Sequence, residues 1–344
     1  MKQSDSCQSK LEMKRPLLKI LSVFAAGYMP ANASLTINPT FASNITSDPN
    51  AATIESSINA DIATIDSYIA NDVTVNITFQ ETSSGLGGSS SFIYGASYNS
   101  YYLALQSRQN QSSYATAAVA SLPNQANNPV NGNANINSVG PLFRALGGAA
   151  NPPGGQPDTT ISLNTSIMNL SRSGAQNSSF YDLQAVAMHE IDEALGIGGT
   201  GSSLAGGTTG PVGPLDLFRY NAPGGRSYSQ GTTIAPYFSV NGGNTALVHF
   251  NQAGGGSDYS DWGNGVIPAQ GAGNTPAQVQ DAFGAPGTQP NLGANEMIAF
   301  DVVGYDLTSA GTALEFSAVP ETGGSPALMC VGLIVAVAAY SKLH

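Results

Sequence analysis

The sequence predicts a domain of the α+β class, and three stretches carry this prediction. Isoleucines recur at spacings of three and four residues over 51–70, which is the pattern of an amphipathic helix. Residues 73–79 then alternate apolar and polar side chains, as a half-buried strand does. A second helical pattern covers 183–195, and the short apolar runs that follow it are separated by glycine-rich segments.

The remaining elements follow from the same patterns. The helix over 183–195 has a capping-box pattern that begins at Ser179 and a natural stop at Gly196. Residues 214–307 are predicted to form short strands and loops. We expect further helices at 98–106 and 114–122, a strand at 159–164 and a packed closing element at 297–307. Stretches rich in glycine, serine or asparagine are expected to be irregular, namely 85–91, 124–137 and 198–213.

The basic residues of the chain are concentrated at its ends. Lys14, Arg15 and Lys19 precede an apolar run and an Ala-Asn-Ala tripeptide, which together form the pattern of a secretory signal peptide. We therefore expect residues 1–33 to be removed by cleavage after Ala33. Residues 34–316 should then form one domain that is secreted or associated with the cell envelope.

Residues 317–344 have the features of a sorting segment. The hexapeptide Val-Pro-Glu-Thr-Gly-Gly starts at Val319 and precedes an apolar run over 327–340, which a single lysine follows. This arrangement resembles the PEP-CTERM class of bacterial sorting signals, in particular the variant that begins Val-Pro-Asp-Ser-Gly. Glu321 and Thr322 differ from that pattern. The resemblance implies recognition by sorting machinery, and a plain hydrophobic tail is the alternative.

The charge of the body excludes two classes of partner. Residues 34–318 contain five arginines and no lysine against nineteen aspartates and glutamates. Such a surface does not neutralise nucleic-acid phosphates or bind anionic lipid. Both cysteines, Cys7 and Cys330, fall outside this body. We expect a monomer without disulfides, stabilised by its core and by bound ions.

The most informative segment is His-Glu-Ile-Asp-Glu at 189–193. Because residues four apart lie on one face of a helix, His189 and Glu193 can contact the same cation, which we expect to be Zn²⁺. Glu190 is the expected general base toward the attacking water, as in the His-Glu-x-x-His motif of zinc peptidases. The motif alone is weak evidence for a metal site because glutamate is common on helices. Its position between a helix cap and Gly196 strengthens the prediction.

A catalytic zinc needs a third protein ligand. We prefer Asp216, an acid flanked by apolar residues, because a carboxylate in such surroundings is paired or bound to a cation. A salt bridge between Asp216 and Arg219 is the structural alternative. His249 is the second candidate ligand, although a lone histidine in an apolar run is more often a packing residue. Tyr220 and Tyr228 are candidate donors to an oxyanion.

Several segments together resemble a known family. The helix segment 189–199, Leu-Asp-Leu-Phe-Arg-Tyr at 215–220 and Asp-Val-Val-Gly-Tyr at 301–305 are similar to segments of secreted bacterial zincin-like metalloproteases with sorting tails. The resemblance spans about residues 51–307. It implies the zincin fold, which has a mixed sheet, an active-site helix and a substrate cleft between them.

The same resemblance implies metal binding by His189 and Glu193 and catalysis by Glu190. Metzincins carry a third histidine at the tenth position after the first, where this chain has Gly199. The function that follows is that of a zinc-dependent metalloendopeptidase acting on a protein or peptide substrate.

Other interpretations stay open. A catalytically inactive cell-envelope or extracellular-matrix protein would have the same polar composition and terminal segments, and Glu193 would then bind no catalytic metal. A carbohydrate-binding module rests only on the aromatic and Asn-, Ser- and Gly-rich loops. Asp258 and Asp261 lie in a glycine-rich loop that suits a structural Ca²⁺. A solvated loop is the alternative there, and Trp262 is a candidate cover for the cleft.

The ligand set predicts the pH dependence of the enzyme. One histidine and two carboxylates formally cancel the charge of Zn²⁺, whereas three neutral histidines leave it intact, so the attacking water should be less acidic. We predict a more alkaline activity optimum than a three-histidine enzyme shows, and easier acceptance of Mn²⁺ or Ca²⁺. A pH–rate profile measures the optimum, and a lower limb well below neutrality would contradict the prediction.

Overall fold

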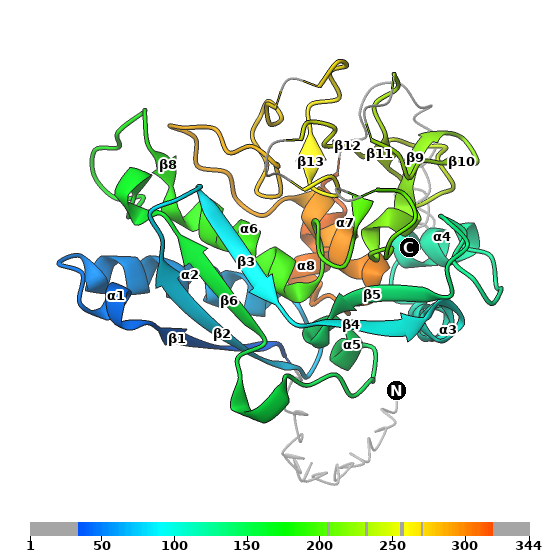
Figure 1. The fold of residues 1–344 in the computed structure, drawn as a ribbon, viewed down its shortest axis with the longest axis horizontal. Coiled ribbons are helices and arrows are strands. Elements are labelled where there is room, and N and C mark those ends of the chain that lie inside the picture. Colours follow the sequence, from blue (N-terminus) through cyan, green and yellow to red (C-terminus); the bar gives the residue numbers. More distant parts are fainter. Residues whose placement is uncertain (1–33, 205–206, 231–232, 255–257, 270, 319–344) are drawn as a thin grey trace, which may run out of the picture. The chain divides into compact units, whose positions relative to one another are not determined.

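The computed structural model describes residues 34–204, 207–230, 233–254, 258–269 and 271–318. These residues combine helices and several sheets, which confirms the α+β prediction (Figure 1). The predicted signal peptide lies outside the described residues, and so does the predicted sorting segment apart from its first two residues. Within the described ranges, no helix is long and apolar enough to cross a membrane.

The first half of the chain builds a four-stranded sheet in the order β1-β2-β6-β3. The strands β1 (Thr36–Phe41), β2 (Thr74–Glu81) and β6 (Thr159–Leu163) are parallel to one another. The fourth strand, β3 (Gly87–Ser91), runs antiparallel to β6. In the described part of the chain β3 has no neighbour on its outer side, so its backbone groups there are free to pair with another strand.

Two long helices, α2 (Ala51–Tyr68) and α6 (Leu183–Leu195), pack side by side on one face of this sheet (Figure 1). Helix α2 contacts β1, and α6 contacts both β6 and β3. The isoleucine stripe of α2 is buried as predicted, with Ile54, Ile58 and Ile65 fully enclosed. Each such side chain contributes about 1.5–3 kcal/mol to the free energy of unfolding.

Helix α6 begins one residue after its cap. The carboxylate of Asp182 accepts a hydrogen bond from the backbone N–H of Ala185 (3.3 Å). The predicted capping box at Ser179 is therefore wrong. The reason is that β8 (Tyr181–Asp182) pairs with β7 (Met168–Asn169) and keeps the chain extended up to the cap. Gly196 ends the helix as predicted, with φ at 105°.

The stretch 85–91 is not an irregular loop, because most of it forms strand β3. A Cβ at Gly87 would lie 2.6 Å from Glu190 Oε1 and 2.8 Å from Val186 Cγ1. The small residues of this strand therefore let it approach helix α6 closely. They carry no apolar alternation, which is why the sequence pattern does not reveal the strand.

The rest of the first half of the chain adds a ribbon and four shorter helices. The predicted helices near 98 and 114 are present, and the Asn-rich stretch ends in a strand, β5, that pairs with β4. The elements are α1 (Ser43–Thr46), β4 (Ile93–Ser97), α3 (Tyr98–Arg108), α4 (Ser113–Ser121), β5 (Asn135–Val139) and α5 (Gly140–Ala145), with 3₁₀ turns at Pro153–Gly155 and Thr165–Ile167.

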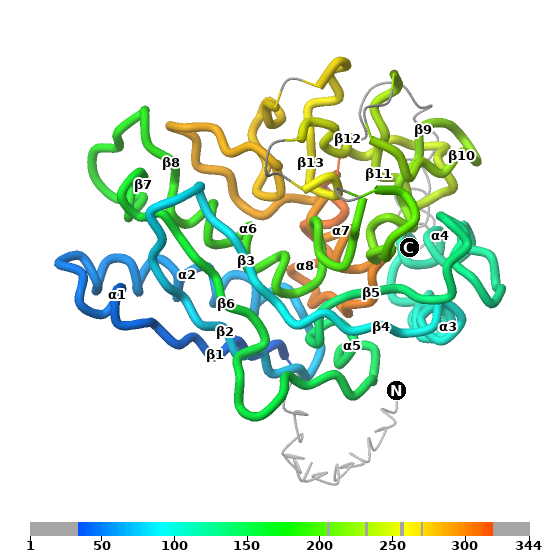
Figure 2. The backbone as a smooth tube through the Cα atoms, viewed as in Figure 1, coloured from blue at the N-terminus to red at the C-terminus, as the bar shows by residue number. Residues whose placement is uncertain are grey.

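The second half of the chain has the predicted short strands and loops. A 3₁₀ turn (Leu215–Phe218) leads into a five-stranded antiparallel sheet in the order β10-β9-β11-β12-β13. In Figure 2 the loop over 277–290 passes beside β8. The strands are β9 (Arg219–Ala222), β10 (Gly225–Arg226), β11 (Tyr237–Phe238), β12 (Val248–Phe250) and β13 (Trp262–Gly263). The closing element is a buried helix, α7 (Ala294–Val303), followed by α8 (Ser309–Glu315).

Helices α7 and α8 bury two carboxyl groups against each other. Glu315 is fully enclosed and neither of its oxygens meets a donor. Asp301 accepts a hydrogen bond from Ser112 Oγ (2.5 Å). Burial, and then the charge of Asp301, raise the pKa of Glu315 to about 9. Glu315 is thus protonated in the folded chain at neutral pH, and its proton can be shared with Asp301.

We predict that Glu315→Gln raises thermal stability at pH 8 and changes it little at pH 5. The folded pKa of about 9 lies above the ordinary value of 4.5, so the free energy of unfolding of the wild type falls as pH rises through this window. The glutamine amide can still donate a hydrogen bond to Asp301. Because it does not titrate, the variant does not lose stability as the pH rises. Melting temperatures should differ at pH 8 by an amount equivalent to at least about 1 kcal/mol. Equal differences at both pH values would contradict the assignment.

Candidate metal centre

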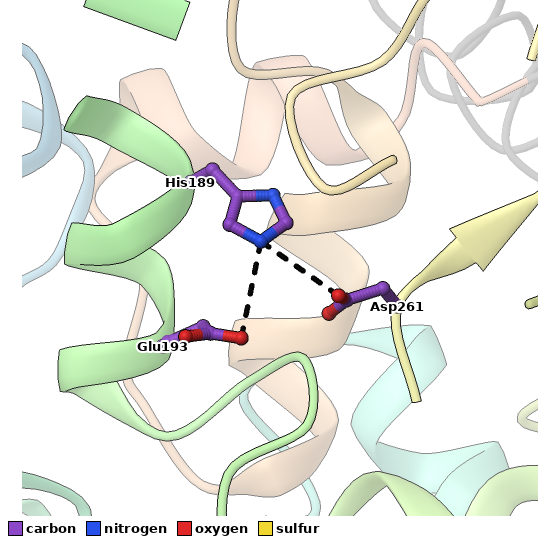
Figure 3. A group of neighbouring side chains, drawn as sticks. All are labelled: His189, Glu193 and Asp261. Atoms are coloured by element: carbon purple, nitrogen blue, oxygen red, sulfur yellow. Dashed lines mark ion pairs between the residues drawn. The ribbon is translucent and has the colours of Figure 1, made fainter. Parts of the chain in front are cut away.

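Three side chains that can bind a cation converge beside helix α6 (Figure 3). His189 and Glu193 come from successive turns of the helix, and Asp261 comes from the residue before β13. His189 Nε2 lies 3.8 Å from Glu193 Oε1 and 3.7 Å from Asp261 Oδ2. Two ligand atoms that share one tetrahedral ion at about 2.1 Å stand about 3.4 Å apart. The group is therefore close to the spacing that one divalent cation requires.

The second ring nitrogen of His189 sets the orientation of the imidazole. Nδ1 lies 2.9 Å from the carbonyl oxygen of Val279, an acceptor that only a protonated Nδ1 can satisfy. The neutral ring then carries its lone pair on Nε2, which faces the two carboxylates. This tautomer is the one that metal ligation by Nε2 requires.

Each carboxylate is held through one oxygen. Ser89 Oγ in β3 donates to Glu193 Oε2 (2.6 Å), and Gln280 Nε2 donates to Asp261 Oδ1 (2.8 Å). The other oxygen of each carboxylate is the one that faces His189. Such outer hydrogen bonds fix the direction of metal ligands and raise affinity.

Glu190 lies beside this group on the same helix. It is buried, and its Oε2 has no hydrogen-bond partner in the described structure. It lines a cleft of about 310 Å³ together with His189, Glu193 and Asp261. The walls of the cleft are β3, helix α6 and the loop over 277–290. A buried carboxylate oxygen without a donor costs free energy. Asp192 and Glu315 also bury such oxygens, so what indicates a functional role for Glu190 is its place in the cleft beside the three converging side chains.

The electrostatics of the group favour a bound cation. Burial, and then the charge of Glu193, raise the pKa of Glu190 well above its usual range, and the same causes act on Asp261. Burial also raises the pKa of Glu193. Burial lowers the pKa of His189, but the charges of Glu190 and Glu193 outweigh this and the net shift is upward. A divalent ion would remove these penalties, so the residues fit a metal.

Asp216, the preferred third ligand from the sequence, does not belong to this group. It is buried as predicted, but its oxygens accept hydrogen bonds from Gly213 N (2.7 Å) and Ser260 Oγ (2.9 Å). The place expected for it beside His189 is taken by Asp261. Asp216 thus binds Ser260, the residue that precedes Asp261, and positions Asp261 indirectly through it.

Arg219 completes this support and is not the simple ion-pair partner that the sequence suggested. Its guanidinium donates to the carbonyl oxygens of Tyr259 (2.5 Å) and Asn251 (3.3 Å) and lies 4.7 Å from the ring centroid of Phe250. The segment on both sides of Asp258 is therefore fastened to β9. Residues of the 215–220 segment therefore hold the loop that carries Asp261.

The other candidates lie elsewhere. His249 is on β12, where its ring packs edge-on against Tyr237, so it is a packing residue and not a ligand of this group. Tyr228 donates to the carbonyl of Pro211 (2.6 Å). Neither it nor Tyr220 lines the cleft. Trp262 does not cover the cleft either, because it is fully buried.

The glycine-rich acidic loop has a different role from the one expected. Asp261 is buried and faces His189, so it is neither solvated nor separate from the main group. A Cβ at Gly198 would lie 2.7 Å from Asp261 Oδ1 and 2.5 Å from Gln280 Nε2. Sequence reasoning missed Ser89, Gln280 and the ligand role of Asp261. The glycines after α6 were the available signal that other residues press against this turn.

Comparison of the chain with protein-family models, with curated proteins and with solved structures finds no match.

We predict that Asp261→Asn removes the bound metal whereas Asp216→Asn keeps it. Asp261→Asn removes the negative charge of one proposed ligand. Asp216→Asn changes only a hydrogen-bond acceptor that supports the loop carrying Asp261. Metal content of the purified full chain after dialysis, with His189→Ala as the reference for complete loss, separates the two. About one equivalent should remain in Asp216→Asn. Loss from Asp216→Asn with retention by Asp261→Asn would reverse the assignment of the third ligand.

Proposed function

We propose that the protein is an exported metal-dependent endopeptidase with a zincin-like fold, in which His189, Glu193 and Asp261 hold the ion and Glu190 is the general base. The observation that carries the proposal is the position of buried Glu190 beside that ligand group, at the floor of a cleft bounded by an unpaired strand edge. The signal-peptide pattern of residues 1–33 supports export.

The arrangement of the first half supports the zincin-like part of the proposal. Zincins combine a mixed sheet, an active-site helix and a cleft between them. Here three parallel strands and one antiparallel edge strand form the sheet, and α6 packs against that edge strand. The cleft lies between β3, α6 and the loop over 277–290.

A peptide is the substrate class that this cleft suits best. The outer edge of β3 presents backbone N–H and C=O groups along one wall, and an extended peptide can pair with them as an added strand. The strand itself is Gly-Gly-Ser-Ser-Ser, so it offers little besides its backbone. The opposite wall carries small apolar residues, Ala277, Val279 and Ala282, which suit apolar substrate side chains.

The residues around the cleft can perform hydrolysis. A divalent cation held by His189, Glu193 and Asp261 supplies Lewis-acid polarisation of a peptide carbonyl and acidification of water. Glu190 then accepts the proton of the attacking water and delivers it to the amide nitrogen as the C–N bond breaks. Ser89 and Gln280 hold the ligand carboxylates in place through hydrogen bonds during this cycle.

An inert surface protein accounts for less of the structure. Such a protein has no need to gather His189, Glu193 and Asp261 in one cleft or to fix the tautomer of His189 toward two carboxylates. These arrangements cost stability and are typical of functional sites. The composition of the body fits both functions, and the site favours the enzyme.

We predict that Glu190→Gln keeps the metal and loses peptidase activity by about 10²- to 10⁴-fold. The amide preserves the shape of the side chain but cannot accept a proton. Metal content and hydrolysis of an unfolded protein substrate by the full chain measure the two properties.

The matched control is Asp192→Asn, which makes the same chemical change two residues away on α6. Asp192 is fully buried and does not line the cleft, and burial raises the pKa of its carboxyl group well above the usual range. Its substitution should leave activity nearly unchanged. Full activity in Glu190→Gln would end the general-base assignment.

A further inference from the structure

Gly199 leaves a space that a second acidic residue fills. Its φ is not in the left-handed region, so the backbone would accept a side chain there, but a Cβ would lie 2.2 Å from both Cγ and Oδ2 of Asp258. The glycine is therefore required by the close approach of the Asp258 carboxyl group and not by the turn. This is also the position at which metzincins carry their third histidine.

The Asp258 carboxyl group lies beside the proposed ligand group of His189, Glu193 and Asp261, of which it is not itself a member. It lines the same cleft as His189, Glu193 and Asp261. Its charge contributes to the raised pKa values of Glu193 and Asp261, after the larger effect of burial. Among the described residues that line the cleft there is no lysine or arginine to balance these charges.

The backbone at Asp258 and at the next residue is held by two hydrogen bonds. Asn251 Nδ2 donates to the carbonyl oxygen of Asp258 (2.9 Å), and Arg219 donates to that of the next residue, Tyr259. Two further observations favour a cation in this cleft: buried Glu190, which lines it, has an oxygen without a partner, and His189 Nε2 is fixed toward Glu193 and Asp261. Anchoring an acid here without a cation would only add repulsion.

We propose that Asp258 is a fourth protein ligand of the metal ion, entering the space that Gly199 leaves open. The inference rests on the proposed metal centre and extends its ligand set to one imidazole and three carboxylates. Oxygen-rich sets suit hard ions such as Mn²⁺, whereas Zn²⁺ is satisfied by three protein ligands. Asp258 therefore narrows the usual preference for Zn²⁺ over Mn²⁺.

The test is titration of Mn²⁺ and of Zn²⁺ into the metal-free full chain by calorimetry, for the wild type and Asp258→Asn. Mn²⁺ affinity should fall at least about tenfold, and Zn²⁺ affinity should fall less. The matched control is Asp281→Asn, because Asp281 lines the same cleft but its carboxylate is bound by Asn274 and Gln278. The control should change either affinity less than about threefold.

The outcomes separate this inference from the proposed function. Equal Mn²⁺ affinity in the wild type and Asp258→Asn, or equal losses in both variants, overturns the ligand role and leaves the three-residue centre intact. Absence of Mn²⁺ and Zn²⁺ binding in the wild type overturns both. Circular dichroism of each variant confirms that the fold is retained.

A second pair of variants tests the geometry without changing the charge. Gly199→Ala should displace the Asp258 carboxyl and weaken Mn²⁺ binding, whereas Gly88→Ala, whose Cβ meets nothing within 4 Å, should not. In an Asp258→Ala background, Gly199→Ala should cause no further loss, because the two changes act on one contact. Additive losses would show that Gly199 acts on the site by another route.

Discussion

The burial of several carboxylates beside one imidazole is the constraint on which the rest of the structure depends. Glu190, Glu193 and Asp261 are each more than nine-tenths enclosed, and the nearest histidine carries at most one positive charge. Charges in such surroundings need donors or a cation. The donors come from distant parts of the chain, because Ser89 lies on the edge strand and Gln280 lies in the loop after β13. The sheet and the later loops are thereby tied to one helix.

The second half of the chain supports the site from behind. Asp216 holds Ser260, and Arg219 holds the backbone of Tyr259, so the segment that carries the downstream acids is fixed to β9. Below it, Trp262 Nε1 donates to Glu296 Oε1 (3.2 Å), which links β13 to the buried helix α7. A buried network of hydrogen bonds of this kind holds the side chain of Asp261 in one position. The strands of this second sheet can be short because side-chain hydrogen bonds also hold the loops between them in place.

The sequence revealed the parts of the site that are local and missed those that depend on tertiary contact. Periodicity and spacing placed His189 and Glu193 on one helix face, since four residues make about one turn. Strand β3 stayed hidden because glycine and serine have no apolar alternation. Asp216 was chosen as a buried acid, and it is one, but its partners are a backbone N–H and a hydroxyl. Tertiary contacts bring Asp261 to the helix, namely the pairing of β12 with β13 and the hydrogen bonds of Ser260 and Gln280.

The spacing of the proposed ligands along the chain has a consequence for how the domain is held together. Glu193 and Asp261 are separated by nearly seventy residues, and residues 34–318 contain no cysteine. An ion bound by both is therefore a crosslink in a chain whose described part has no disulfide. Closing a loop of this length restricts the unfolded ensemble by about 4 kcal/mol when the link is covalent. The ion that activates water would then also link helix α6 to the loop that carries Asp261. Metal binding would thus stabilise the folded domain and assemble the catalytic site in the same step.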